Sequence, residues 1–158
     1  MRLRDEMEKY FDRIKGQYAY DCVLGLSGGK DSSYLLYHLI KVKKMKVLAV
    51  HINMHFESRV AEKNIEALRK RLDFDLETVD PGFEFYRKFF RTLFLNPNKA
   101  GYLKSICYTC GPLNIGFCLK TAVDRKIPLV LLAFSPNQPE DLFFEWGREI
   151  IRAKDWIP

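Results

Sequence analysis

The chain has 158 residues, a length typical of a single domain that buries its core without disulfides or metals. Hydrophobic residues make up 47% and charged residues 29%, which excludes disordered, collagen-like and disulfide-stapled proteins. The formal net charge of +6 is compatible with nucleic acid or phosphorylated ligands. The densest basic run, 41–46, is more typical of a solvated helix end whose lysines complement the helix dipole.

The first third of the chain predicts a helix, a strand, a loop and a second helix. Apolar residues at helical spacing predict a helix over 3–14, which Gly16 ends. A short apolar run over 20–26 is typical of a buried strand. The glycine-containing segment 27–32 is a loop, and 33–40 predicts a largely buried helix.

The middle third repeats this order. A second buried strand is expected over 47–52, and helical spacing predicts a helix over 61–72. A short strand at 76–79 follows, and Asp80-Pro81-Gly82 breaks the chain. Aromatic residues then predict a helix over 83–94.

The last third begins with an expected loop over 96–102. The next helix is expected to begin near Pro112, because proline suits the first turn of a helix. A fourth buried strand is expected over 129–134, and an amphipathic helix over 141–153.

Buried strands that alternate with helices predict an α/β fold, a doubly wound and mainly parallel sheet with helices on both faces. Ligands of such sheets bind beyond the carboxyl ends of the strands, here the loops after Leu26, Ile52 and Phe134. No apolar run reaches the roughly 20 residues of a membrane span, and the charged start is unlike a signal peptide. We therefore expect one cytoplasmic domain over 1–158.

The loop after the first strand carries the sharpest motif. Gly28 and Gly29 allow successive N–H groups to turn toward one anion, and the following helix start adds a positive dipole end. Ser27 and Ser32 add hydroxyl donors, and Lys30 adds a full charge. The loop is either a phosphate or pyrophosphate site or an ordinary glycine-rich turn.

Two common nucleotide loops do not fit this segment. A Walker A loop requires glycine where Leu24 stands and serine or threonine where Asp31 stands. The dinucleotide fingerprint requires a spacing that Gly25, Gly28 and Gly29 lack.

Residues 27–32, Ser-Gly-Gly-Lys-Asp-Ser, instead resemble the S-G-G-x-D-S signature of the PP-loop family, the N-type ATP pyrophosphatases. The resemblance implies a Rossmann-like, adenine nucleotide alpha hydrolase-like fold. It also implies an enzyme that binds ATP and Mg²⁺, adenylates an acceptor and releases pyrophosphate. A nitrogen or sulfur nucleophile would then displace AMP.

The resemblance also implies roles for single residues. Lys30, Asp31 and Ser32 would be catalytic, with Asp31 helping to ligate Mg²⁺, although Asp31 also suits a helix cap. The nucleotide would be bound by Leu26, Ser27, Gly28, Gly29, Lys30, Asp31, Ser32, His51, Ile52, Asn53 and Phe134. His51 and His55 are each either catalytic or structural. The Gly-His of many relatives is absent from 133–141.

Four cysteines allow several interpretations. Cys22 lies in an apolar strand and is expected in the core. Cys107 and Cys110 form a C-x-x-C placed just before the predicted helix, and Cys118 follows within it. The pair could hold zinc or an iron–sulfur cluster, with Cys118 as a third ligand only if the turn folds back. It could instead carry thiol chemistry near the helix start, or both cysteines could be structural.

A C-x-x-C in this region also resembles the tRNA-thiolating members of the family, so sulfur transfer to tRNA is the favoured reaction. Amidation of a small molecule or sugar is the alternative, as is a non-catalytic ATP- or AMP-binding subunit. Phenylalanines on more than one face of 83–94 suggest a homodimer or a partner subunit, or burial within the chain.

Overall fold

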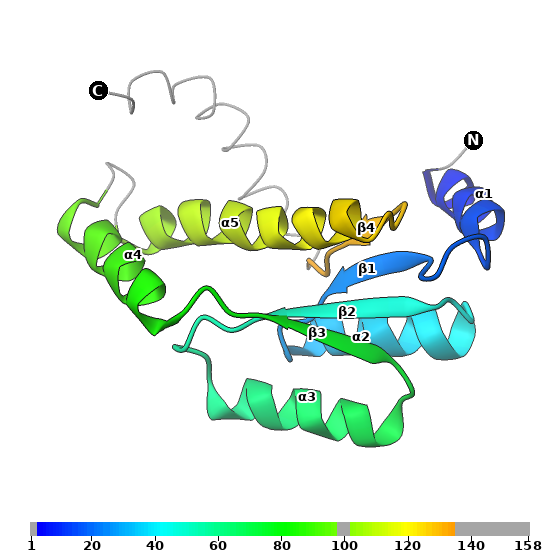
Figure 1. Cartoon of the computed structure of the whole chain (residues 1–158), viewed down its shortest axis with the longest axis horizontal. Coiled ribbons are helices and arrows are strands. Elements are labelled where there is room, and N and C mark those ends of the chain that lie inside the picture. Colours follow the sequence, from blue (N-terminus) through cyan, green and yellow to red (C-terminus); the bar gives the residue numbers. More distant parts are fainter. Residues whose placement is uncertain (1–2, 98–101, 135–158) are drawn as a thin grey trace.

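The computed structural model describes residues 3–97 and 102–134, as a four-stranded sheet with helices around it (Figure 1). In chain order the elements are α1 (Leu3–Ile14), β1 (Cys22–Gly25), α2 (Lys30–Tyr37), the π-helical η1 (His38–Val42), β2 (Val47–Ile52), α3 (Arg59–Arg71), β3 (Asp75–Val79), α4 (Phe83–Leu95), α5 (Tyr102–Asp124) and β4 (Val130–Leu131). The helix expected over 141–153 lies outside the described residues. Within the described ranges, none of the helices combines the length and apolar character needed to cross a bilayer.

The sheet has the order β3-β2-β1-β4, and every strand pair is parallel. Val23 of the central strand β1 pairs with Leu48 of β2 on one side and with Val130 of β4 on the other. The chain therefore builds the sheet outward to β3 and then returns to the far side of β1. This reversal opens a crevice at the carboxyl ends of β1 and β4.

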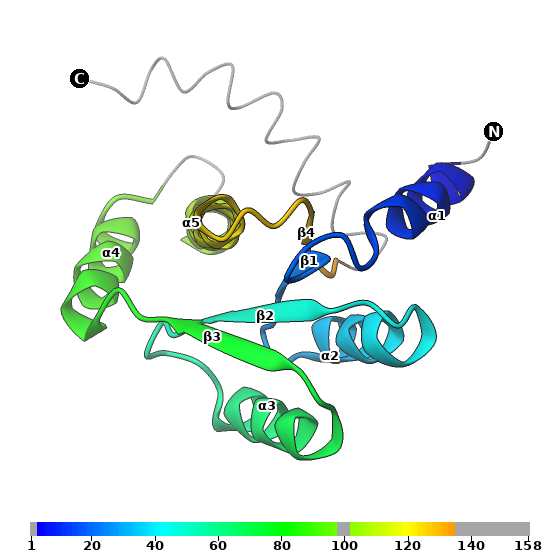
Figure 2. The same ribbon diagram turned by 45° about the vertical axis from the view of Figure 1, so that its right-hand side comes forward.

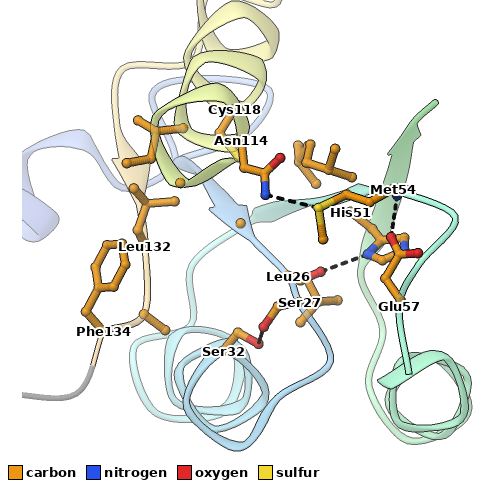
Figure 3. Close-up of a pocket in the computed structure, with 16 residues that line it drawn as sticks. Leu26, Ser27, Ser32, His51, Met54, Glu57, Asn114, Cys118, Leu132 and Phe134 are labelled. Atoms are coloured by element: carbon orange, nitrogen blue, oxygen red, sulfur yellow. Dashed lines mark hydrogen bonds between the residues drawn. The ribbon is translucent and has the colours of Figure 1, made fainter. Parts of the chain in front are cut away.

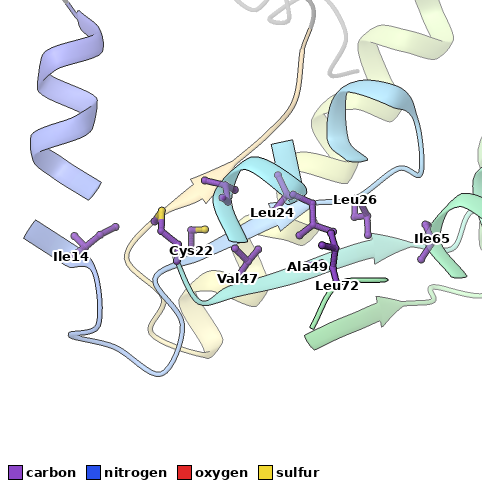
Figure 4. Close-up of a cluster of buried hydrophobic side chains, with 11 residues drawn as sticks. Ile14, Cys22, Leu24, Leu26, Val47, Ala49, Ile65 and Leu72 are labelled. Atoms are coloured by element: carbon purple, nitrogen blue, oxygen red, sulfur yellow. The ribbon is translucent and has the colours of Figure 1, made fainter. Parts of the chain in front are cut away.

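Alternate residues of β1 face opposite layers, as a strand buried on both faces requires. Cys22 and Leu24 belong to a buried cluster with residues of α2 and α3, shown in Figure 4. Val23 belongs to a second cluster, which includes Tyr86 of α4 and Cys118 of α5. Figure 2 shows α2 and α3 on one side of the sheet and α5 on the other. The doubly wound α/β prediction is confirmed.

The sequence placed several element ends wrongly. The strand expected over 20–26 is limited to Cys22–Gly25, and the one expected over 129–134 to Val130–Leu131. Helix α2 begins at Lys30 rather than at residue 33, because the loop turns directly into the helix after Gly29.

Helix α5 begins at Tyr102, ten residues before the start expected at Pro112, which lies inside the helix. A proline inside a helix removes the bond to the carbonyl four residues earlier and crowds that carbonyl, so other contacts must stabilise the helix. Leu113 and Phe117 pack against the buried cluster on the sheet, and this packing supports the helix around the proline. The C-x-x-C is therefore part of α5 and does not precede it.

Two surface features bear on the expected partners. Lys43, from the basic run 41–46, lies 2.5 Å from the carboxylate of Glu8 in α1 and caps η1, as a helix-end role predicts. On α4, Phe83, Phe85 and Phe94 remain exposed while Tyr86 is buried. A second copy or partner subunit on this face stays a prediction.

Candidate functional site

A pocket of about 260 Å³ lies at the carboxyl ends of β1, β2 and β4 (Figure 3). Its walls come from the loop after β1, the end of β2 and the turn that follows it, α5 and the segment after β4. The lining residues are Gly25, Leu26, Ser27, Ser32, Val50, His51, Ile52, Met54, Glu57, Gly111, Asn114, Ile115, Cys118, Leu132, Ala133 and Phe134. The pocket therefore occupies the crevice that the strand order predicts.

The loop and the first turn of α2 supply hydrogen-bond donors to this pocket. The Oγ atoms of Ser27 and Ser32 lie 3.1 Å apart, and Ser32 also donates to the Gly29 carbonyl at 3.3 Å. Gly29 is the N-cap residue, so the N–H groups of the first turn have no partner within the helix. Such a helix start, beside two hydroxyls, is suited to a phosphate group.

Gly28 is required by two separate features of the loop. Its φ angle is +73°, in the region that side-chain-bearing residues rarely adopt. A Cβ atom at this position would lie 2.4 Å from the carbonyl oxygen of Ala61 in α3. The loop can therefore approach α3 this closely only with glycine here.

Lys30 and Asp31 lie outside the pocket lining, at the exposed start of α2. Their Nζ and Oδ1 atoms are 2.7 Å apart, and the side chains are 82% and 41% exposed. Asp31 is not the N-cap, since Gly29 holds that position. An accessible carboxylate beside a phosphate-binding loop fits Mg²⁺, which binds proteins through one or two carboxylates together with substrate phosphates.

His51 joins the pocket wall to the loop. Its Nδ1 atom donates to the carbonyl oxygen of Leu26 at 3.1 Å, because a carbonyl can only accept. The N–H of Leu26 in turn donates to Val50 in β2 at 2.8 Å. His51 thus has a structural bond and also lines the pocket, and a catalytic role for it stays a prediction.

The structure brings Ile52 and Phe134 into the pocket lining but places Asn53 in a separate polar cluster. Asn53 Nδ2 donates to Asp80 at 3.0 Å, and His55 Nε2 lies 2.8 Å from the same carboxylate. The bond to His55, together with the N–H of Gly82, holds the pKa of Asp80 below its usual value. This cluster joins the ends of β2 and β3.

The cysteines do not form one site in the described part of the chain. Burial raises the pKa of Cys22 to about 12 and that of Cys118 to about 11, so both thiols stay protonated. Cys110 and Cys118 are eight residues apart in one helix, about 12 Å along its axis, and cannot bind the same ion. Among the described residues, no three His, Cys, Asp or Glu side chains are grouped as metal ligands.

Cys107 and Cys110 also lie away from a helix start. Both are inside α5, so the helix-start activation expected of Cys110 is wrong. The Cys110 thiol lies 3.5 Å from the sulfur of Met54. This contact ties α5 to the turn after β2.

Several pocket residues were missed by sequence reasoning, among them the polar or sulfur-bearing Met54, Glu57 and Asn114. Glu57 accepts a hydrogen bond from the backbone N–H of Met54, which shapes the turn after β2. The Asn114 amide nitrogen lies 3.6 Å from the Met54 sulfur, while its buried oxygen has no partner among the described residues. The sequence signal that could have indicated them was position: Met54 and Glu57 follow the end of a strand, and Asn114 lies in the helix that contains the C-x-x-C.

No protein-family model matches this sequence, and no curated protein matches it. Solved structures do match. The NH3-dependent NAD synthetase from Campylobacter jejuni superimposes with a TM-score of 0.55 at 16% identity, covering 82% of this chain and 56% of the synthetase. This chain shares the fold of that synthetase.

Two further solved structures share this fold. The NMN synthetase from Francisella tularensis has a TM-score of 0.56 at 15% identity, covering 82% of this chain and 53% of that protein. The glutamine-dependent NAD+ synthetase from Acinetobacter baumannii, solved with ADP, has a TM-score of 0.52 at 22% identity, covering 87% of this chain and 24% of that one. The chain spans about half the length of the first two proteins and about a quarter of the third.

Proposed function

We propose that this chain binds ATP with Mg²⁺ in the pocket and activates an acceptor carboxyl group as an adenylate, with release of pyrophosphate. The observation that carries the proposal is the position of the Ser27–Ser32 loop. It has the PP-loop sequence, begins a helix and opens into the pocket at the reversal of strand order. The site would make the chain an ATP-dependent ligase or a subunit of one.

The loop accounts for the release of pyrophosphate. As the bond between the α and β phosphates breaks, negative charge collects on the leaving group. The N–H groups of the α2 start are already oriented, and the hydroxyls of Ser27 and Ser32 can turn from their present partners to stabilise that charge. Lys30 is exposed and can add its ammonium group, and Mg²⁺, held by Asp31, would neutralise phosphate charge.

The pocket is largely apolar beyond the loop, which suits a nucleobase. Leu26, Ile52 and Phe134 line it together with the buried thiol of Cys118. These residues exclude water from the base, while the polar loop takes the phosphates. ADP in the Acinetobacter baumannii synthetase supports an adenine nucleotide as the ligand of this fold.

Amidation is proposed in place of the sulfur transfer to tRNA favoured by the C-x-x-C. The preference for sulfur rested on the basic charge and on a C-x-x-C just before the predicted helix, whereas Cys107 and Cys110 lie within α5. Support for nitrogen comes from the Campylobacter jejuni synthetase, which is NH3-dependent. The acceptor would be a small molecule that bears a carboxylate.

The test begins with isothermal titration calorimetry of ATP in the presence of Mg²⁺, on the wild type and on Ser32→Ala. Loss of the buried hydroxyl removes a donor from the loop, so we expect ATP to bind about tenfold more weakly. Ser33→Ala is the matched control, because the Ser33 hydroxyl has no partner among the described residues and lies outside the pocket lining. Its ATP affinity should equal that of the wild type.

Pyrophosphate release is then measured with ATP, ammonium chloride and a panel of small carboxylic acids. Release that depends on one acid supports an amide-forming ligase. A wild type that binds no ATP would reject the proposal. Tight ATP binding without pyrophosphate from any acid would instead favour a nucleotide-binding subunit, an alternative suggested by the partial coverage of the synthetases.

A further inference from the structure

The peptide that joins Gly28 to Gly29 is the freest in the phosphate loop. Both residues joined by this peptide are glycines without side chains, so the peptide plane can rotate with little steric cost. Its N–H is one of the few groups that can bind a phosphate from the loop itself. A loop that binds anions tightly therefore needs a contact that holds this plane in one orientation.

Helix α3 supplies such a contact from outside the pocket. The Nδ2 atom of Asn64 donates to the carbonyl oxygen of Gly28 at 2.8 Å. Three residues earlier, on the same face of the helix, the Ala61 backbone lies against the Gly28 Cα. The loop thus rests against α3, with its carbonyl held by one side-chain amide.

The planar trans peptide converts this contact into an orientation of the N–H group. The carbonyl of Gly28 and the N–H of Gly29 point in opposite directions across one plane. With the carbonyl held toward α3, the N–H points away from α3, toward Ser27 Oγ at 3.4 Å. Ser27 lines the pocket, so the N–H faces the proposed phosphate site.

We infer that Asn64 is a positioning residue of the phosphate loop, whose amide fixes the Gly28–Gly29 peptide with its N–H toward the pyrophosphate portion of the nucleotide. The inference rests on the proposed ATP site. Asn64 touches no substrate and acts through the loop. Its effect should therefore follow the number of phosphates on the ligand and leave the base and ribose unaffected.

The experiment compares ATP, inorganic pyrophosphate and adenosine by calorimetry on the wild type and on Asn64→Ala. We expect ATP and pyrophosphate to bind about five- to tenfold more weakly to the variant, with adenosine affinity unchanged. Asn64 is exposed and alanine is the stronger helix former, so α3 should remain folded. Asn64→Gln retains an amide donor and should restore part of the pyrophosphate affinity.

Asn96→Ala is the matched control, because Asn96 Nδ2 also donates to a backbone carbonyl, that of Thr92 at 3.0 Å, at the end of α4. It should bind all three ligands as the wild type does. Unchanged pyrophosphate affinity in Asn64→Ala would overturn the inference, and so would an equal loss of adenosine binding. A wild type that binds neither ATP nor pyrophosphate would overturn the proposed function as well.

Discussion

At the scale of single residues, the candidate site depends on backbone orientation as much as on side chains. Gly28 brings the loop against α3, and His51 ties the loop to the end of β2. The charged side chains of the loop, Lys30 and Asp31, remain at the exposed edge. The site therefore presents its anion-binding groups mainly as N–H and hydroxyl donors.

Gly28→Ala tests the close approach of loop and helix. The substitution would place a side chain at a φ of +73° and 2.4 Å from the Ala61 oxygen, so the loop must shift. We expect the free energy of unfolding to fall by about 1–3 kcal/mol, measured by urea denaturation, with loss of ATP binding. Gly29→Ala, where φ is −77°, should destabilise less. Equal losses in the two variants would contradict this account.

The Asp80 cluster should make stability depend on pH on the acid side. Asp80 has a pKa below the usual 3.8 because His55 and Gly82 hydrogen-bond its charged form. As the pH falls, Asp80 therefore takes up its proton at a higher pH in the unfolded chain than in the folded one. The stabilisation is present above about pH 4 and is lost as the pH falls through the lowered pKa. Urea denaturation should show a steeper loss of stability below about pH 4 in the wild type than in Asp80→Asn. If the free energy of unfolding fell with pH in parallel in the two proteins, the Asp80 cluster would contribute nothing to the pH dependence.

Sequence reasoning could find the residues of the loop but not those that hold it. Residues 27–32 are contiguous, and their order alone describes a strand, a turn and a helix start. Asn64, Glu57 and Asn114 reach the site through tertiary packing of α3, the turn after β2 and α5. An asparagine on an exposed helix face has no local pattern that distinguishes it from a solvated one.

At the scale of elements, α5 is where local signals and packing disagree most. Gly111 and Pro112 are typical of a helix boundary, and the sequence placed the boundary there. The structure continues the helix through both residues because its later turns bury Cys118 and Ala122 against the sheet. Apolar strands such as β2 needed no tertiary information, since burial on both faces leaves a continuous apolar run.

A glycine in the same helix offers a way to stabilise the protein. Gly116 lies inside α5, and a Cβ atom there would meet nothing within 4 Å. Gly116→Ala should raise the free energy of unfolding by about 0.5–1 kcal/mol, because alanine loses less backbone entropy in a helix. Gly16→Ala has equally open space but a φ of +74°, so it should destabilise. Urea denaturation of both variants should therefore give changes of opposite sign.

At the scale of the whole molecule, the strand order determines when the sheet can be completed during folding. Val23 of β1 pairs early with Leu48, but its other partner is Val130. Before β4 arrives, the sheet of β1, β2 and β3 has an open edge at its future centre. Unpaired edges favour association between chains, and pairings so distant in sequence form slowly. Folding during synthesis should therefore pass through a stage that already contains the phosphate loop and is most prone to aggregation at β1.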